Sequence, residues 1–113
     1  MTDAPSPIAL QIWDMKYRLK APDGSPVDDD VEASWRRVAS ALASAEDESG
    51  RDGHDQAFFD AMSGYKFLPA GRILAGAGTE WNVTLFNSFV VGTVPDDMAG
   101  IFDHLKEAAL TMQ

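Results

Sequence analysis

The chain has 113 residues, with 18 acidic and 9 basic side chains, a net charge of −9 and no cysteine. That length suits one small domain, and an apolar content of 45% disfavours intrinsic disorder. The acidic balance disfavours nucleic acid as a partner, and the missing cysteines exclude disulfides, thiolate nucleophiles and cysteine-type metal sites. No apolar run approaches the roughly 20 residues of a membrane span, and no signal peptide is evident, so we expect no membrane partner and a cytoplasmic location.

The N-terminal part begins with a predicted frayed tail over residues 1–7. Residues 8–20 are amphipathic, and their apolar spacing fits either a helical face or the beginning of a strand. Residues 22–26 (PDGSP) predict a turn, because proline presets φ and glycine accepts a positive φ.

The clearest predicted helix follows this turn. Asp29 is placed to cap it, and Glu32 three residues later completes a pattern like a capping box. Apolar side chains then recur at alternating spacings of four and three residues, which is one face of a helix. These side chains are Val31, Trp35, Val38, Leu42 and Ala45. The neighbouring Arg36 and Arg37 fall on other faces.

A second helix is predicted over residues 55–63, with Gly64 placed to end it. Its buried side is supplied by Phe58, Phe59 and Met62. Residues 69–79 (PAGRILAGAGT) come next and contain three glycines and a proline. These residues disfavour a regular helix, so we expect a glycine-rich loop there.

Residues 83–94 (VTLFNSFVVGTV) are apolar on both alternating faces, which is typical of a strand buried on both sides. We expect a strand over about residues 83–92 and a final helix over about 96–113. Pro95 and Asp96 are placed to end the strand and to cap this helix. The fold class is therefore α/β or mostly α. A doubly buried strand needs parallel neighbours, and the final helix carries no stop signal, so we expect the chain to continue in a parent protein.

Few residues suggest chemistry by themselves. The loop at Gly71 and Arg72 could offer backbone N–H groups and a guanidinium to a phosphate, although a tight structural turn explains the same pattern. Ser88 lacks a suitably spaced His/Asp pair, so the local pattern predicts a buried strand serine. His54 and His104 lack a second ligand at metal spacing, so no metal site is expected.

Six segments, in chain order, resemble the N-terminal region of adenosylcobalamin-dependent (class II) ribonucleotide reductases. They are residues 11–20, 23–28, 35–39, 67–79 and 84–90, and lastly 100–103 followed by 106–113. Each is weak alone, but six in register are highly specific. The resemblance implies one N-terminal domain over residues 8–113. Its parts would be a helical part (about 8–65), the glycine-rich loop (69–79), and the first strand (83–92) and helix (96–113) of a ten-stranded α/β barrel that is otherwise absent.

The resemblance also implies an activity, the reduction of ribonucleoside diphosphates to deoxyribonucleotides for DNA synthesis by a thiyl-radical mechanism. In the family a cysteine pair supplies two electrons, and one member of that pair occupies the position of Ser88. Gly71, Arg72, Asn87 and Ser88 map near the ribose and phosphate of the ribonucleotide substrate. The residues that bind adenosylcobalamin lie beyond this chain.

Two expectations follow from the resemblance. Because serine cannot form a disulfide, redox chemistry at Ser88 is lost and the isolated chain is expected to be inactive. The alternative is a non-enzymatic interaction module. Such a module would self-associate, or dock on a full reductase or another partner, through apolar faces that its missing neighbours would otherwise cover.

Overall fold

The computed structural model describes residues 4–113, which form five α-helices, one short 3₁₀ turn and no β-strand. The elements are α1 (Pro7–Lys16), α2 (Val31–Ala43), α3 (Arg51–Met62), η1 (Ser63–Tyr65), α4 (Gly71–Gly76) and α5 (Met98–Met112). The mostly helical form of the expected fold class is therefore confirmed. None of these helices is both long and apolar enough to cross a membrane.

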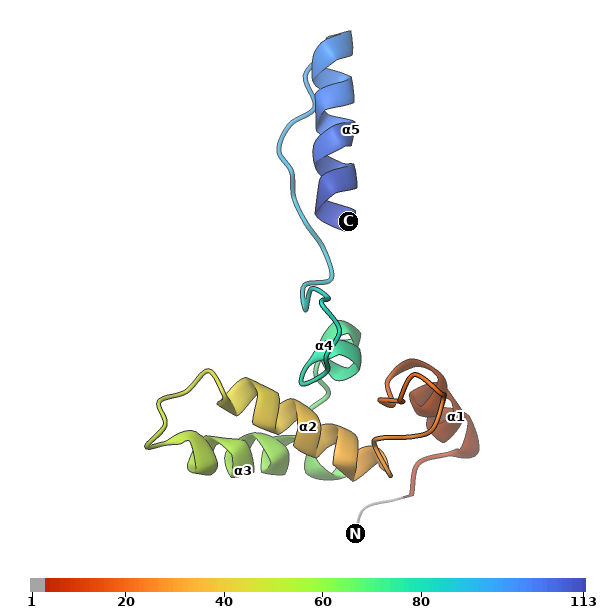
Figure 1. Ribbon diagram of the computed structural model, residues 1–113, viewed down its shortest axis with the longest axis vertical. Coiled ribbons are helices and arrows are strands. Elements are labelled where there is room, and N and C mark those ends of the chain that lie inside the picture. Colours follow the sequence, from red (N-terminus) through yellow and green to blue (C-terminus); the bar gives the residue numbers. More distant parts are fainter. Residues whose placement is uncertain (1–3) are drawn as a thin grey trace.

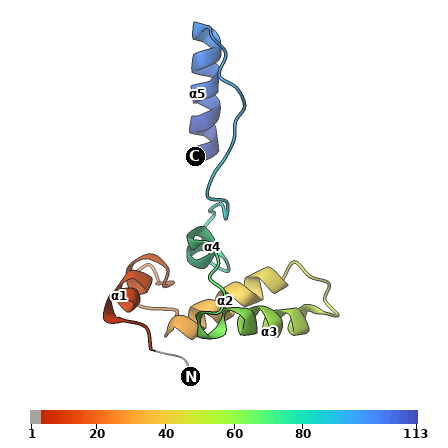
Figure 2. The same ribbon diagram turned by 180° about the vertical axis from the view of Figure 1, so that it is seen from behind.

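The molecule has two visibly different parts (Figure 1). Helices α1 to α4 gather into one part, here called the helical body (residues 4–79). Residues 80–113, here called the C-terminal arm, project away from it and end in α5, as the opposite view also shows (Figure 2). The Cα radius of gyration is 18.3 Å, whereas a compact chain of this length would have about 13 Å.

The first helix begins earlier than the predicted tail allows. Pro7 occupies its first turn, and the Ser6 side chain accepts a hydrogen bond from the Ala9 amide at 3.3 Å. The tail prediction is therefore wrong for residues 6 and 7, while residues 1–3 lie outside the described part of the chain. Of the two interpretations of residues 8–20, the helix is correct as far as Lys16.

The predicted turn is confirmed. Gly24 has a φ of +88°, and the Asp23 carboxylate accepts hydrogen bonds from the amide and the hydroxyl of Ser25 at 2.9 and 2.6 Å. Lys20 and Pro26 form an antiparallel bridge across it. The turn therefore brings the chain back toward the end of α1 before α2 begins.

Helix α2 is capped by Asp30, one residue later than predicted. Its carboxylate accepts a hydrogen bond from the Ala33 amide at 2.8 Å, so Asp29 is not the cap. The buried side chains of α2 are Ser34, Trp35, Val38, Ala39 and Ala43. Leu42 is 38% exposed and Ala45 lies beyond the helix, contrary to prediction. The buried face differs because α2 packs against both α3 and α4.

Helix α3 runs antiparallel to α2 (Figure 1) and begins at Arg51, four residues before the predicted start. Met62 is buried, and Phe58 and Phe59 pack partly buried against the core, as predicted. Gly64 follows with a φ of +67° and ends the helix as expected. Tyr65 also has a positive φ, +62°, and its ring meets that of Trp35 edge-on at 5.0 Å between centroids.

The glycine-rich stretch contains helix α4, so the prediction of an irregular loop over residues 69–79 is wrong in its centre. The glycines do not prevent the helix because Gly71 and Gly76 stand at its two ends, leaving four good helix formers between them. Gly71 also lies against Tyr17, where an added Cβ would come within 3.2 Å of the tyrosine ring. The bare backbone at Gly71 thus lets α4 pack closely on the segment after α1.

Residues 83–94 form no strand, contrary to the prediction for residues 83–92. They run as an extended chain in which Phe86 is 71% exposed, Phe89 50% and Val90 96%. A strand needs a neighbour to accept and donate its backbone hydrogen bonds. The described residues offer this segment none, so its apolar side chains remain uncovered.

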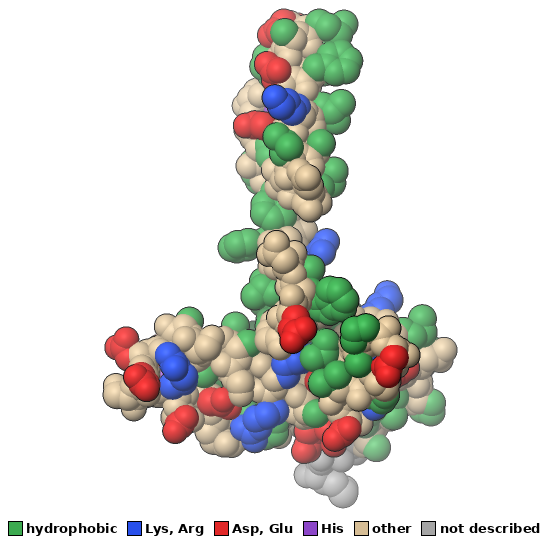
Figure 3. Space-filling view, in the orientation of Figure 1, with side chains coloured by type: hydrophobic (Ala, Val, Ile, Leu, Met, Phe, Trp, Pro, Cys, Tyr) green, Lys and Arg blue, Asp and Glu red, His purple; other side chains and the backbone are tan. Residues whose placement is uncertain are grey.

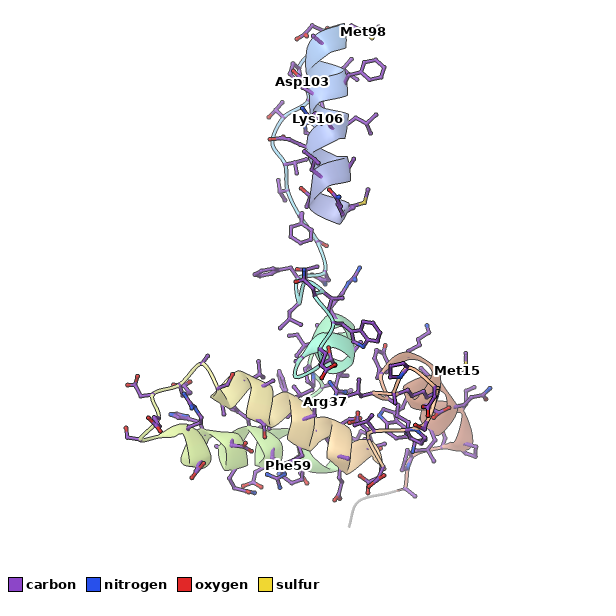
Figure 4. The ribbon with its side chains drawn as sticks, in the orientation of Figure 1. Met15, Arg37, Phe59, Met98, Asp103 and Lys106 are labelled. Atoms are coloured by element: carbon purple, nitrogen blue, oxygen red, sulfur yellow. The ribbon has the colours of Figure 1, made fainter. Side chains whose placement is uncertain are left out.

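Helix α5 begins at Met98 and is capped by Asp97, not Asp96. The Asp97 carboxylate accepts a hydrogen bond from the Gly100 amide at 2.7 Å. Asp103 and Lys106 lie beside the extended segment, whereas Met98 stands at the far end of the arm (Figure 4). Hydrophobic side chains line the outer edge of α5 (Figure 3). The large exposed apolar side chains of this helix have exposed fractions between 43% and 81%. They are Met98, Ile101, Phe102, Leu105, Leu110 and Met112.

Candidate functional site

Three of the four predicted site residues line one hollow. Arg72, Asn87 and Ser88 border a space of about 540 Å³ between α4, the extended segment and the last turn of α5. Thr84 and Thr111 add hydroxyl groups to the same lining. The hollow thus combines one guanidinium, one amide and three hydroxyls.

These groups are suited to an oxygen-rich ligand. A guanidinium can donate two parallel hydrogen bonds to a phosphate, and amides and hydroxyls can both donate to and accept from sugar hydroxyls. Arg72 is exposed and therefore accessible from solvent. The arrangement can bind an anionic, hydroxylated molecule, but it contains no acid–base pair for catalysis.

Gly71 is separated from the other three residues. It lines an apolar groove of about 390 Å³ that α1, α2 and α4 form together. Trp13, Trp35 and Leu74 are among the side chains that border this groove. Gly71 therefore contributes to packing against Tyr17 and not to the hollow around Arg72.

Ser88 lies on the exposed extended segment, so the prediction of a buried strand serine is wrong. Neither histidine borders the hollow around Ser88. His104 borders a different hollow, between residues 91–95 and α5, and His54 lies in α3. The Ser88 hydroxyl can hydrogen-bond a ligand in the hollow.

A buried ion pair forms the polar centre of the helical body, and the sequence patterns did not reveal it. The Arg37 guanidinium lies 3.0 Å from the Asp28 carboxylate, and the two side chains are only 9% and 5% exposed. Asp28 also accepts hydrogen bonds from the Ser34 hydroxyl at 2.6 Å and the Leu19 amide at 3.1 Å. The carboxylate is therefore fully satisfied in spite of its burial.

The surroundings of Asp28 keep it ionised. Burial by itself would raise the pKa of this carboxyl, because the charged form loses its water. The hydrogen bonds from Arg37, Ser34 and the Leu19 amide, with the positive charge of Arg37, outweigh that effect. The pKa of Asp28 consequently lies below its ordinary value.

Arg37 also binds three backbone carbonyls. Its guanidinium donates to Ala77 at 2.6 Å, to Leu74 at 2.9 Å and to Tyr17 at 3.2 Å. Figure 4 shows Arg37 where α2 faces α4. One side chain thereby connects the segment after α1, the middle of α2 and the end of α4.

Neighbouring groups extend this network toward the N-terminus. The Trp13 indole donates to the Ser34 hydroxyl at 3.0 Å, and Arg18 donates to the Asp28 carbonyl at 2.7 Å. Arg18 also pairs with Asp14 at 2.9 Å, one helical turn earlier. Trp13 thus links α1 to α2, and Arg18 links the segment after α1 to the segment before α2.

A sequence signal for this pair did exist. Ser34, Arg37 and Ala41 follow spacings of three and four and lie on one flank of α2, beside its apolar face. The small side chains at 34 and 41 leave room for a guanidinium to turn inward. The prediction from the apolar spacing instead placed Arg37 on another face of the helix.

Neither a metal-ligand cluster nor an unpartnered buried side-chain polar atom is present among the described residues. No group of three or more His, Cys, Asp or Glu side chains within residues 4–113 could hold a metal ion. No buried side-chain polar atom in that range lacks a hydrogen-bond partner.

One family model matches the part of the chain that forms the helical body. The family model for the ribonucleotide reductase all-alpha domain matches residues 3–82, which is well over half of the chain. No curated protein and no solved structure matches the chain. Gly71, Arg72 and the Asp28–Arg37 pair lie inside the matched range, while Asn87 and Ser88 lie outside it. The chain belongs to the ribonucleotide reductase all-alpha domain family.

Proposed function

We propose that this chain is the N-terminal domain of an adenosylcobalamin-dependent reductase that acts on ribonucleoside diphosphates. The family match over residues 3–82 supports the ribonucleotide reductase part of this proposal, and the cobalamin-dependent class rests on the resemblance of the six segments. The six segments in class II register extend the argument beyond the match, to the end of α5. The cytoplasm, where deoxyribonucleotides are needed for DNA synthesis, is the proposed location.

In this proposal the chain contacts substrate and supplies no electrons. Arg72 binds the substrate phosphate through its guanidinium, and Asn87 and Ser88 bind ribose hydroxyls. The meeting of these three residues around one hollow supports that assignment. Reduction of the ribose releases its 2′ hydroxyl as water and consumes two electrons, which a cysteine pair supplies by becoming a disulfide. Ser88 cannot form that disulfide, so the chain as it stands is inactive.

A chimeric reductase tests the class and the role of position 88. The N-terminal region of an active cobalamin-dependent reductase would be replaced by this chain, either unchanged or with Ser88→Cys. We expect multiple-turnover reduction of a ribonucleoside diphosphate only with Ser88→Cys, since a thiol at about pKa 8.5 can enter disulfide exchange and a hydroxyl cannot. Equal turnover by both chimeras would contradict the proposal, as would a folded Ser88→Cys chimera without activity.

A binding experiment tests the substrate contacts in the chain itself. Cytidine diphosphate would be titrated into the ¹⁵N-labelled chain while the side-chain resonances of Arg72 and Asn87 are followed. Arg72→Gln should weaken binding about tenfold or more, because a charge-assisted pair is lost. Arg51→Gln is the matched control, since Arg51 lies at the start of α3 and outside the hollow. Equal affinity of the two variants would remove Arg72 from the site.

The exposed apolar edge of α5 favours a second candidate function. Phe102 and Leu105 are 60% and 61% exposed, and solitary soluble domains seldom leave such a stripe uncovered. In this reading the chain is a non-enzymatic module that docks on a full reductase through α5. Fluorescence anisotropy of the labelled chain against a full reductase would then show saturable binding that Phe102→Asp abolishes. Absence of saturable binding would exclude this function.

A further inference from the structure

We infer that Arg37, held by Asp28, is a positioning residue that fixes helix α4 and thereby places Arg72 for its ligand. The fixing of α4 stands on geometry alone. The consequence for ligand binding rests on the proposed function, because it takes Arg72 as a phosphate contact.

Helix α4 needs an external anchor. It has six residues, far fewer than the roughly 12 that make an isolated helix even marginal in water. The last carbonyls of a helix have no partner within the helix itself. Arg37 donates to two of these carbonyls, Leu74 at 2.9 Å and Ala77 at 2.6 Å, and its positive charge suits the negative end of the helix.

Asp28 holds the guanidinium in the orientation that this anchor requires. It accepts from Nε at 3.2 Å and from Nη2 at 3.0 Å, while Nη1 is directed to Ala77. Because Arg37 is only 9% exposed, water cannot readily replace these partners. A lysine could keep the charge near Asp28, but its single ammonium cannot reproduce the planar fork that reaches both carbonyls.

Gly78 lets the end of the α4 segment come close enough to Arg37. Its φ is +73°, and an added Cβ would come within 2.9 Å of Arg37 Cγ and 3.0 Å of the Arg37 carbonyl oxygen. A side chain at this position would push the segment away from α2 without removing any charge. Gly78→Ala therefore disturbs the same anchor by a route independent of the ion pair.

Arg72 would respond to any such movement. It lies in the first turn of α4 and borders the hollow together with Asn87 and Ser88, which belong to the arm. A bidentate contact with a phosphate tolerates little displacement. Loosening of α4 should therefore weaken phosphate binding, although Arg37 itself does not border the hollow.

Amide hydrogen exchange on the ¹⁵N-labelled chain tests the anchor. The α4 amides of Leu74 and Ala77 donate to Ala70 and Ile73, and His54 in α3 donates to Gly50 as a reference. Arg37→Lys and Gly78→Ala should each lower protection of the α4 amides about tenfold or more relative to His54. Arg36→Gln is the matched control, because Arg36 is the adjacent arginine, half exposed and paired with Asp55 at 3.5 Å. It should change neither region.

Two outcomes would overturn the anchor. One is an equal loss of protection in α3 and α4, which would mean that Arg37 only stabilises the whole body. The other is full α4 protection in Arg37→Lys, which would mean that charge alone suffices.

Titration with inorganic pyrophosphate, followed at the Arg72 side chain, tests the consequence for binding. Arg37→Lys should weaken binding severalfold through the loosened helix. Unchanged affinity in a variant whose α4 amides have lost protection would overturn the positioning role. A wild-type chain that binds neither pyrophosphate nor cytidine diphosphate would contradict the proposed function, while loosening of α4 in Arg37→Lys would still support the anchor.

Discussion

The helical body and the C-terminal arm contain similar apolar side chains, but the body buries them and the arm leaves them exposed. In the body, Trp35, Val38 and Met62 are 5%, 0% and 3% exposed. In the arm, every residue from 80 to 90 is exposed, and the small and polar side of α5 faces the extended segment. An apolar pattern therefore becomes a core only where another element of the same chain can face it.

The family match ends close to the boundary between the helical body and the arm. It ends at residue 82, and the body ends at residue 79. The matched region is thus the part that packs on itself, through hydrophobic contacts around α2 and the polar network around Arg37. If the body alone determines stability, changes there should be costly, and equivalent changes in the arm should have little effect.

The largest expected effect comes from breaking the buried ion pair. Asp28→Asn leaves the Arg37 charge without its carboxylate in a site that is 9% exposed. Loss of one partner of a buried pair typically costs about 3–5 kcal/mol, which is enough to unfold a small body. Urea denaturation followed by circular dichroism would measure it. Asp103→Asn in the exposed part of α5 is the counterpart and should change the free energy of unfolding by less than about 0.5 kcal/mol.

Two tryptophans provide a similar contrast without charge. Trp35 is 5% exposed and Trp81 is 61% exposed. Trp35→Ala should lower the free energy of unfolding by about 3–5 kcal/mol because it leaves a cavity. Trp81→Ala should lower it by less than about 0.5 kcal/mol. Comparable losses in both variants would show that the arm packs on the body in solution.

Acid should weaken the body through Asp28. The pKa of this carboxyl is lower in the folded chain than the ordinary value of 3.8, because hydrogen bonds from Arg37 and Ser34 more than offset the effect of burial. The unfolded chain therefore takes up a proton first as the pH falls. The contribution of Asp28 is complete well above pH 3.8 and is lost as the pH falls through the lower, folded pKa.

Urea midpoints between pH 7 and pH 2 would measure this loss. The difference between the wild-type chain and Asp28→Asn should shrink at the acid end. A difference that stays constant over the whole range would contradict the stated direction of the pKa change.

The smallest contrast concerns two helix caps of the same type. Asp30 and Asp97 each accept a hydrogen bond from the amide three residues later, at 2.8 and 2.7 Å. Asp30→Ala should lower the free energy of unfolding of the body by about 1 kcal/mol. Asp97→Ala should reduce the helicity of α5, seen in its Cα chemical shifts, and leave the urea midpoint unchanged. A lower midpoint in Asp97→Ala would mean that the arm and the body unfold together.

Local patterns in the sequence predicted local structure well. The spacing around Trp35 and Val38, the turn at Gly24 and the end of α3 at Gly64 each depend on a few neighbouring residues, and each is confirmed. The caps were misplaced by one residue, because consecutive aspartates offer equivalent choices. The helix in residues 71–76 was missed because its glycines were counted without regard to their position at its ends.

Features that depend on distant partners could not be predicted in this way. The backbone carbonyls that Arg37 binds lie 20 residues earlier and up to 40 residues later in the chain, and no local spacing encodes them. The pattern of residues 83–92 indicates burial on both faces, but it cannot say which segments cover those faces. Of the candidate site, Arg72, Asn87 and Ser88 border one hollow and Gly71 packs against Tyr17, while their role toward a substrate stays a prediction.

The consecutive positive φ angles of Gly64 and Tyr65 make position 65 a compromise between backbone and side chain. This conformation destabilises an L-residue other than glycine by about 1–2 kcal/mol. An edge-on aromatic pair stabilises by about 0.5–1.5 kcal/mol beyond its burial. Tyr65 is thus retained by its ring on Trp35, at the expense of its own backbone. Asparagine at position 65 would reduce the strain of the positive φ but would lose the contact of the ring with Trp35. Because Tyr65 is only 40% exposed, asparagine would lose the burial of the ring as well as the aromatic pair, so the ring stabilises the body in spite of the unfavourable backbone conformation.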